Sequence, residues 1–137
     1  MNKDHSVLII EDEIILQDAY KLVLSSKGYQ VRTANNGAAG LVMLKEHTPD
    51  LILLDIFMPV MDGKEFLKTV NLKDYPKLKI IVYTNLSDSN VEEEMLAMGA
   101  HKFVLKSSMK PQDLIDLIAE CLSDVRNLNS RTKRNLR

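Results

Sequence analysis

The chain places carboxylates, a hydroxyl and an ammonium at the ends of short apolar runs, and the carboxylates of such a set could bind a cation. These residues are Glu11, Asp12, Asp55, Thr84 and Lys106. Asp55 follows the aliphatic run 51–54 and precedes a loop that contains Pro59 and Gly63. Open α/β sheets bind ligands beyond the carboxyl ends of their strands, where Asp55 would lie. The same local pattern also suits a residue that only begins a turn.

Apolar runs alternate with segments of helical periodicity along the chain. The runs predict strands at residues 6–10, 30–34, 51–54, 79–84 and 102–106. The helical segments carry apolar residues within 15–23, 38–44, 66–70, 91–98 and 114–125. Strands that alternate with helices pair in parallel through right-handed crossovers. The sequence therefore predicts an α/β fold, with a five-stranded parallel sheet and helices on both faces.

Individual residues indicate how the helices begin and pack. Asp62 and Ser89 each start a sequence with capping-box spacing, so we expect a helix after each. Gly40 lies inside the second helix, where glycine costs roughly 1 kcal/mol against alanine, and close packing would explain it. In the first helix, the apolar stripe expected to face the sheet consists of Ile15, Ala19, Leu22 and Val23.

The charged residues gain their meaning from the sheet. The carboxyl ends of parallel strands share one edge, and in the flavodoxin-like order 2-1-3-4-5 the first and third strands are neighbours. Glu11, Asp12 and Asp55 would then lie together, opposed by Lys106. Adjacent like charges raise carboxylate pKa values, and a hard divalent cation would relieve the repulsion. Ligand sets made only of oxygen favour Mg²⁺, with Mn²⁺ as the alternative.

Composition excludes several classes of protein. The length of 137 residues fits one domain. A net charge of −1 with 27% charged residues indicates neither a nucleic-acid binder nor an acidic tail protein. The single cysteine excludes an internal disulfide framework and a cysteine metal cluster. The apolar runs are too short to cross a bilayer and no signal sequence is present, so we expect a cytoplasmic protein.

The composition changes near the end of the chain. Residues 126–137 are polar and basic and carry no apolar stripe. We expect them to form a solvated, flexible tail. The predicted organisation is one domain over residues 1–125 and a basic tail over residues 126–137.

In combination, these motifs resemble the receiver domain of two-component response regulators, with its CheY-like (βα)5 fold. The resemblance covers about residues 5–125, nearly the whole chain. The motifs that carry it are Glu11-Asp12-Glu13, Asp55, Met58-Pro59, Asp62-Gly63, Thr84, Gly99-Ala100, Phe103 and Lys106.

The resemblance implies a phosphoryl acceptor and a metal site. Asp55 would accept the phosphoryl group from a histidine kinase or a histidine phosphotransfer protein. Asp12, Asp55 and the Phe57 carbonyl would ligate Mg²⁺ directly, while Glu11 would act largely through water. Such a protein is a phosphoacceptor that also loses its phosphoryl group, and it is not a turnover enzyme.

The resemblance also implies a switch. Thr84 and Lys106 would hold the phosphoryl oxygens, and Phe103 would be the aromatic residue whose rotamer follows phosphorylation. Ser107 stands where the family usually has proline, and a cis bond before it would cost about 2.5–4 kcal/mol. Asn85 replaces the usual small residue after Thr84, so it would narrow access to the pocket.

We expect the output to pass through a protein surface. The face made by the fourth helix, the fifth strand and the fifth helix would bind a downstream protein. The basic tail offers no base-reading element, so sequence-specific DNA binding is not expected. The chain is expected to be a stand-alone regulator without an output domain, and a monomer or a weak phosphorylation-dependent dimer.

Other functions fit less well. A phosphatase of the haloacid dehalogenase type would need a second aspartate two residues after the nucleophile, where this chain has Phe57. A pseudo-receiver scaffold would normally lack Asp55, Asp12 or Lys106, and all three are present. A flavin-binding protein of the same fold would need a phosphate loop, but the first turn is acidic.

Overall fold

A parallel sheet in the strand order β2-β1-β3-β4-β5 forms the centre of the molecule, as predicted. The structure is a computed structural model that describes residues 5–85 and 89–123. The strands are β1 (Ser6–Ile10), β2 (Gln30–Ala34), β3 (Leu51–Asp55), β4 (Lys79–Thr84) and β5 (Lys102–Leu105). The helices are α1 (Ile14–Ser26), α2 (Gly37–Glu46), α3 (Gly63–Thr69), α4 (Ser89–Ala97) and α5 (Pro111–Leu122). Two short 3₁₀ turns are η1 (Leu72–Asp74) and η2 (Lys106–Ser108).

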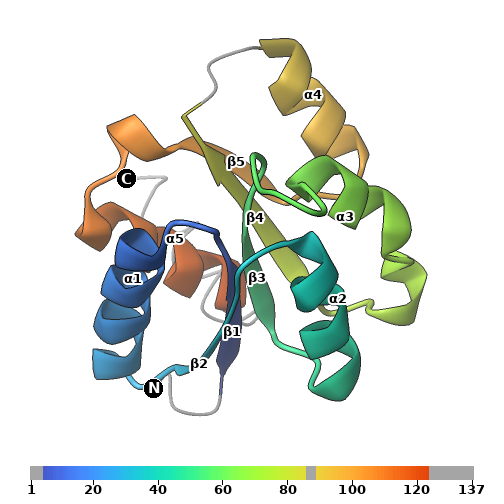
Figure 1. Ribbon diagram of the computed structural model, residues 1–137. Helices are drawn as coiled ribbons and strands as arrows, with labels where there is room; N and C mark the ends of the chain where they lie inside the picture. Colours follow the sequence, from blue (N-terminus) through green and yellow to red (C-terminus); the bar gives the residue numbers. More distant parts are fainter. Residues whose placement is uncertain (1–4, 86–88, 124–137) are drawn as a thin grey trace.

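The helices cover the sheet from both sides, so the molecule has two cores (Figure 1). Helices α1 and α5 bury one face, where Leu24 and Ile118 pack against strand residues that include Leu53. Helices α2, α3 and α4 bury the other face, where Phe66 and Met95 pack against the opposite side chains. Successive side chains of a strand point to opposite faces, so a strand buried on both sides reads as an unbroken apolar run. Among the described residues, no helix is long and apolar enough to span a membrane.

The predicted strands agree with the structure except that β3 also includes Asp55 and that the fifth ends one residue early. Strand β5 stops at Leu105, and Lys106 instead opens the 3₁₀ turn η2. The predicted helix start at Ser89 agrees with α4, and the capping box there stays a prediction. The prediction at Asp62 is confirmed, since its Oδ1 accepts the Glu65 N–H at 2.8 Å.

The predicted buried face of α1 is wrong. Ile15 and Leu22 are 88% and 72% exposed. The residues of α1 that are buried are Gln17, Tyr20 and Leu24. A large aromatic ring and a polar amide therefore take the positions that the apolar stripe was expected to fill.

Hydrogen bonds explain why a polar residue of α1 turns inward. The Gln17 amide nitrogen donates to the Glu11 carbonyl oxygen at 2.9 Å and to Asn35 Oδ1 at 3.0 Å. Burying an amide is tolerable only when it is paired in this way. Gln17 thus ties α1 to the ends of β1 and β2, next to the acidic residues.

Glycines allow two helices to approach the sheet closely. A Cβ atom at Gly40 would lie 2.5 Å from Ile10 Cδ1, which confirms the close packing expected there. At Gly63 the same atom would collide with the carbonyl oxygen of Asp55. The Gly63 N–H donates to the Ile56 carbonyl at 2.8 Å. The start of α3 is therefore packed directly against the backbone that carries Asp55.

Replacing Gly63 with alanine should destabilise the domain. The added methyl group meets backbone atoms that cannot rotate away, so we expect a loss on the order of 1–3 kcal/mol in the free energy of unfolding. Urea denaturation of the wild type and Gly63→Ala measures it. Lys64→Ala in the same turn removes an exposed ion pair with Glu94 and should change stability by less than about 1 kcal/mol. Equal stabilities for Gly63→Ala and the wild type would contradict the close approach.

Candidate functional site

Glu11 is the most deeply buried charged group at the carboxyl edge of the sheet. It follows β1 and is fully buried. Its Oε1 accepts a hydrogen bond from Lys106 Nζ at 2.8 Å and another from the Tyr83 hydroxyl at 2.6 Å. Its Oε2 accepts the Glu13 N–H at 3.0 Å. Three donors therefore compensate the cost of burying this carboxylate.

Asp55 ends β3 and shares the same ammonium. Its side chain is buried, and its Oδ2 lies 3.4 Å from Lys106 Nζ. In the sheet register Asp55 pairs with Tyr83 of β4, the residue whose hydroxyl contacts Glu11. One lysine thus lies between two buried carboxylates.

The two carboxylates are charged unequally as a result. Burial raises the pKa of Glu11, but Lys106, Tyr83 and the Glu13 N–H more than offset it, so the pKa lies below its ordinary value. Burial, together with the negative charge of Glu11, raises the pKa of Asp55 from 3.8 to about 7. Lys106 opposes that rise, but its ammonium is nearer to Glu11 than to Asp55. Burial lowers the pKa of Lys106, but the two carboxylates raise that pKa by more. The net pKa is above its ordinary value, so the lysine stays protonated.

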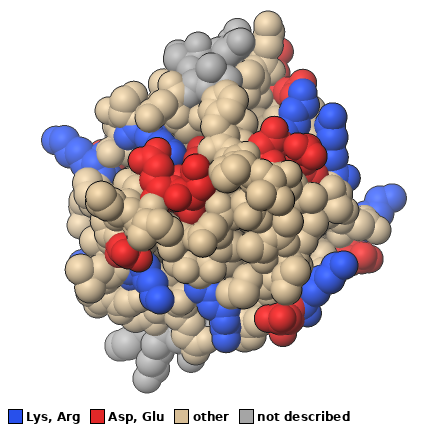
Figure 2. Space-filling view, in the orientation of Figure 1, with Lys and Arg blue, Asp and Glu red and all other residues tan. Residues whose placement is uncertain are grey.

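The predicted metal ligands lie close to one another. Asp12 is half-buried, and one carboxylate oxygen from each of Glu11, Asp12 and Asp55 lies within 4.8 Å of the others. Hard divalent cations such as Mg²⁺ prefer ligand sets made only of oxygen, and the poorly compensated charge of Asp55 favours such a cation. The residues present therefore fit Mg²⁺. Figure 2 shows Asp and Glu surface beside Lys or Arg surface on this face of the molecule.

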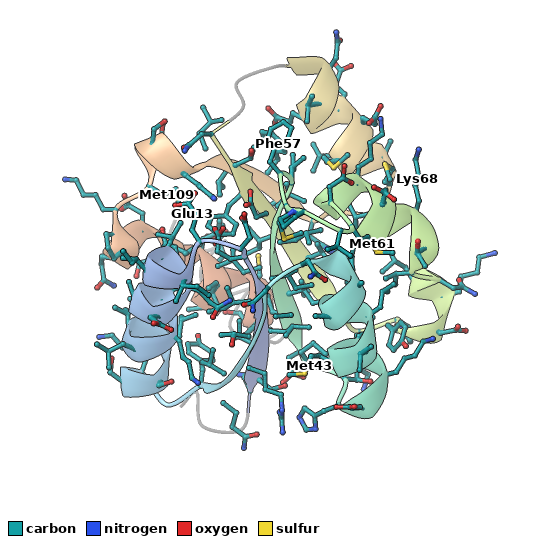
Figure 3. The ribbon with its side chains drawn as sticks, viewed as in Figure 1. Glu13, Met43, Phe57, Met61, Lys68 and Met109 are labelled. Carbon is teal, nitrogen blue, oxygen red and sulfur yellow. The ribbon has the colours of Figure 1, made fainter. Side chains whose placement is uncertain are left out.

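Phe57 lies in the loop after β3, and Figure 3 shows it near that end of the sheet. Its side chain is 59% exposed. The proposed metal ligand is its backbone carbonyl, and that role stays a prediction. Three residues further along, Val60 is 80% exposed and has a φ of 69°. A positive φ is rare for a β-branched residue. The loop beside Asp55 therefore holds a strained backbone.

The other two predicted residues, Thr84 and Phe103, lie in β4 and β5. Thr84 ends β4, is 1% exposed and pairs in register with Leu105. Phe103 lies in β5, is half-buried and packs in the core cluster under α4 that also contains Val82. The geometry brings Thr84 to the end of the strand next to β3, as expected. The roles of Thr84 and Phe103 in switching stay predictions.

The departures at Ser107 and Asn85 now have positions. Ser107 lies in the 3₁₀ turn η2, and no peptide bond of the described chain is cis. Asn85 is exposed directly after Thr84.

Sequence reasoning missed Tyr83 as a site residue. Its position one residue before Thr84, in a strand whose neighbours are aliphatic, was the signal that could have identified it.

The metal-free protein should lose stability as the pH rises through the pKa of Asp55. Because that pKa is raised to about 7, the native state binds more protons than the unfolded state between about pH 4 and pH 7. Asp55→Asn should therefore add on the order of 1–3 kcal/mol to the free energy of unfolding at pH 8 and much less at pH 5. Urea unfolding in the presence of a chelator measures both values.

The titration of His101 does not affect the difference between the two proteins. His101 also titrates in this range, with a pKa lowered by burial and by Lys79, but it is unchanged in the variant and cancels in the difference. An equal effect of Asp55→Asn at pH 5 and pH 8 would contradict the raised pKa.

The chain resembles known proteins over most of its length. It is 38% identical over 101 residues to the transcriptional regulatory protein AfsQ1 of Streptomyces coelicolor, a match that covers 74% of this chain and 44% of that protein. It is 33% identical over 103 residues to the chemotaxis protein CheY of Bacillus subtilis, covering 74% of this chain and 85% of CheY. Thus it spans less than half of the one relative and most of the other.

A solved structure and a family model agree with these relatives. The crystal structure of Vibrio cholerae chemotaxis protein CheY4 has a TM-score of 0.79 and 29% identity, and the match covers 86% of this chain and 98% of that one. The family model for the response regulator receiver domain matches residues 7–119. The parallel sheet is thus that of a known fold, and the chain belongs to the response regulator receiver domains of two-component signalling.

Proposed function

We propose that Asp55 accepts a phosphoryl group from a histidine kinase or a histidine phosphotransfer protein and that this event switches a protein-binding surface. The observation that carries the proposal is the position of Asp55, buried at the end of β3 with Lys106 Nζ 3.4 Å away. The nearby Glu11 and Asp12 complete an oxygen-only cluster that fits Mg²⁺.

The transfer requires an in-line displacement at phosphorus. A carboxylate oxygen of Asp55 forms the new O–P bond while the P–N bond of the phosphohistidine breaks, and its electron pair returns to the imidazole nitrogen. Both reactants are anionic, so positive charge must offset the oxygens of the transferring group. Lys106 supplies one such charge, and bound Mg²⁺ would supply more. Glu11, Asp12, Asp55 and the Phe57 carbonyl would hold the ion.

The alternatives have less support. A haloacid-dehalogenase-type phosphatase would need an acid two residues after Asp55, and the side chain of Phe57 there is apolar and 59% exposed. A pseudo-receiver would not need Glu11, Asp12, Asp55 and Lys106 gathered in one place. We therefore propose a phosphoacceptor that later loses its phosphoryl group by hydrolysis, without turnover of a separate substrate. A cytoplasmic location, a stand-alone role and a monomer or weak phosphorylation-dependent dimer stay predictions.

The response should pass to the face made by α4, β5 and α5. Phe103 lies in β5 and packs into the same core cluster as Met95 of α4. Thr84 of β4 pairs in register with Leu105 of β5, at the ends of these two strands. A shift of Thr84 toward a phosphoryl group on Asp55 would therefore repack residues that lie under this face. The basic tail, residues 126–137, lies outside the described residues.

Asp55 should be the residue that takes up the phosphoryl group. Incubation of the purified chain with acetyl phosphate and Mg²⁺ should raise the intact mass by one phosphoryl group. Asp55→Asn should abolish the increase, because an amide oxygen is a poor nucleophile, while Asp50→Asn should leave it unchanged. Undiminished labelling of Asp55→Asn would contradict the assignment.

Loss of Phe103 should uncouple labelling from partner binding. Phe103→Ala should still be labelled at Asp55, since Phe103 makes no described contact with that residue, but it should lose partners that bind the labelled wild type. A pull-down from a lysate of the source organism, with and without acetyl phosphate, makes the comparison. Deletion of residues 126–137 should retain those partners. The reverse pattern would show that the tail carries the output.

A further inference from the structure

Tyr83 carries a hydroxyl into the acidic site from the core beneath it. Its side chain is 1% exposed, and its ring packs edge-on against Tyr20 with centroids 5.8 Å apart. The hydroxyl donates to Glu11 Oε1 at 2.6 Å, and Lys106 Nζ lies 4.8 Å from the centre of the ring. The tyrosine thus touches both the acid and the lysine of the site, and neither the transfer chemistry nor the metal cluster uses it.

Lys106 has two buried carboxylate partners, and phosphoryl transfer changes how the ammonium is shared between them. The ammonium is now 2.8 Å from Glu11 Oε1 and 3.4 Å from Asp55 Oδ2. As the O–P bond forms at Asp55 and the donor's bond to phosphorus breaks, the new anionic oxygens gather on the Asp55 side. Lys106 must then give up part of its bond to Glu11 in order to meet them. Glu11, with no exposed surface, cannot replace the lost donor with bulk water.

We propose that Tyr83 is a positioning residue that holds Glu11 while Lys106 moves from Glu11 to the phosphoryl group on Asp55. The inference rests on the proposed function of Asp55. The Tyr83 hydroxyl is one of two donors to Glu11 Oε1 before transfer and becomes the main one during it. An interaction that strengthens between the ground state and the transition state raises the rate, whereas one of constant strength does not.

The phenol is well placed to stay still during this exchange. Tyr83 belongs to β4, which pairs with both β3 and β5, and its register partner in β3 is Asp55 itself. The ring is enclosed by the α1 and α5 core, where Tyr20 also lies. A long lysine side chain can swing between two acceptors, but a ring fixed in a packed core holds its hydroxyl in one place.

The test compares labelling rates of full-length variants with acetyl phosphate and Mg²⁺ by intact mass. Tyr83→Phe removes one oxygen and keeps the ring, and we expect labelling about tenfold slower, ~1.4 kcal/mol in activation free energy. Tyr29→Phe is the matched control, because the Tyr29 hydroxyl lies in the same core cluster, buried and without a hydrogen-bond partner. It should label at the wild-type rate. The rise in melting temperature caused by Mg²⁺ should be the same in all three proteins.

A second measurement follows the Tyr83 hydroxyl in the wild-type protein. The Tyr83 hydroxyl proton, assigned by its absence from Tyr83→Phe, should be visible by proton NMR without metal, with Mg²⁺, and with Mg²⁺ plus beryllium fluoride as a phosphoryl mimic. We expect it to move downfield in the third state, since its bond to Glu11 is then less shared.

The outcomes separate this inference from the proposed function. Tyr83→Phe labelling at the wild-type rate, or loss of the hydroxyl signal with beryllium fluoride, would overturn the role of Tyr83. An equal slowing of Tyr29→Phe, or loss of the Mg²⁺ response in Tyr83→Phe, would also overturn it, because general damage to the fold would then be the cause. A wild type that is not labelled at all would instead overturn the phosphoacceptor function of Asp55.

Discussion

One protonated lysine shared by two buried carboxylates is the constraint on which the rest of this site depends. Lys106 reaches both Glu11 and Asp55, and removing the lysine would leave two buried carboxylates without their shared partner, which is costly. The strand order places β1 next to β3, so Glu11 and Asp55 lie close together. It places β5 on the other side of β4, so Lys106 reaches the two acids from that side. The glycine at position 63 lets α3 begin against the backbone of Asp55. Fold and site therefore satisfy one electrostatic requirement together.

The same arrangement makes the two acids chemically different. Glu11 has three donors and stays ionised, whereas Asp55 has a more distant ammonium and a like charge beside it. Desolvation and repulsion therefore act most strongly on the residue that is proposed to accept the phosphoryl group. A group in this condition binds cations readily, because a cation relieves both costs. Asp55, whose buried charge is compensated less well than that of Glu11, is thus the residue that is proposed to be phosphorylated.

Much of the fold could be predicted because parallel sheets leave a simple signature. Leu51–Asp55 is buried throughout and reads as an unbroken apolar run that ends in a carboxylate. Periodicity failed for α1, where Ile15 is exposed and Gln17 is buried, because counting apolar residues ignores an amide that finds partners. The bond from Tyr83 to Glu11 was also beyond reach. Neither residue carries a local pattern that names the other, and only the finished sheet register brings them together.

The separation of these contacts along the chain has a consequence for folding. Tyr83 and Lys106 lie 72 and 95 residues from Glu11 in sequence, so these two contacts have a high contact order and cannot form locally. The lysine follows β5, an edge strand that pairs only with β4. Transient opening of that edge would remove Lys106 from both acids while leaving β1 and β3 joined. A chain in which β5 is not paired with β4 would therefore lack Lys106 at the site and would not carry out the proposed signalling.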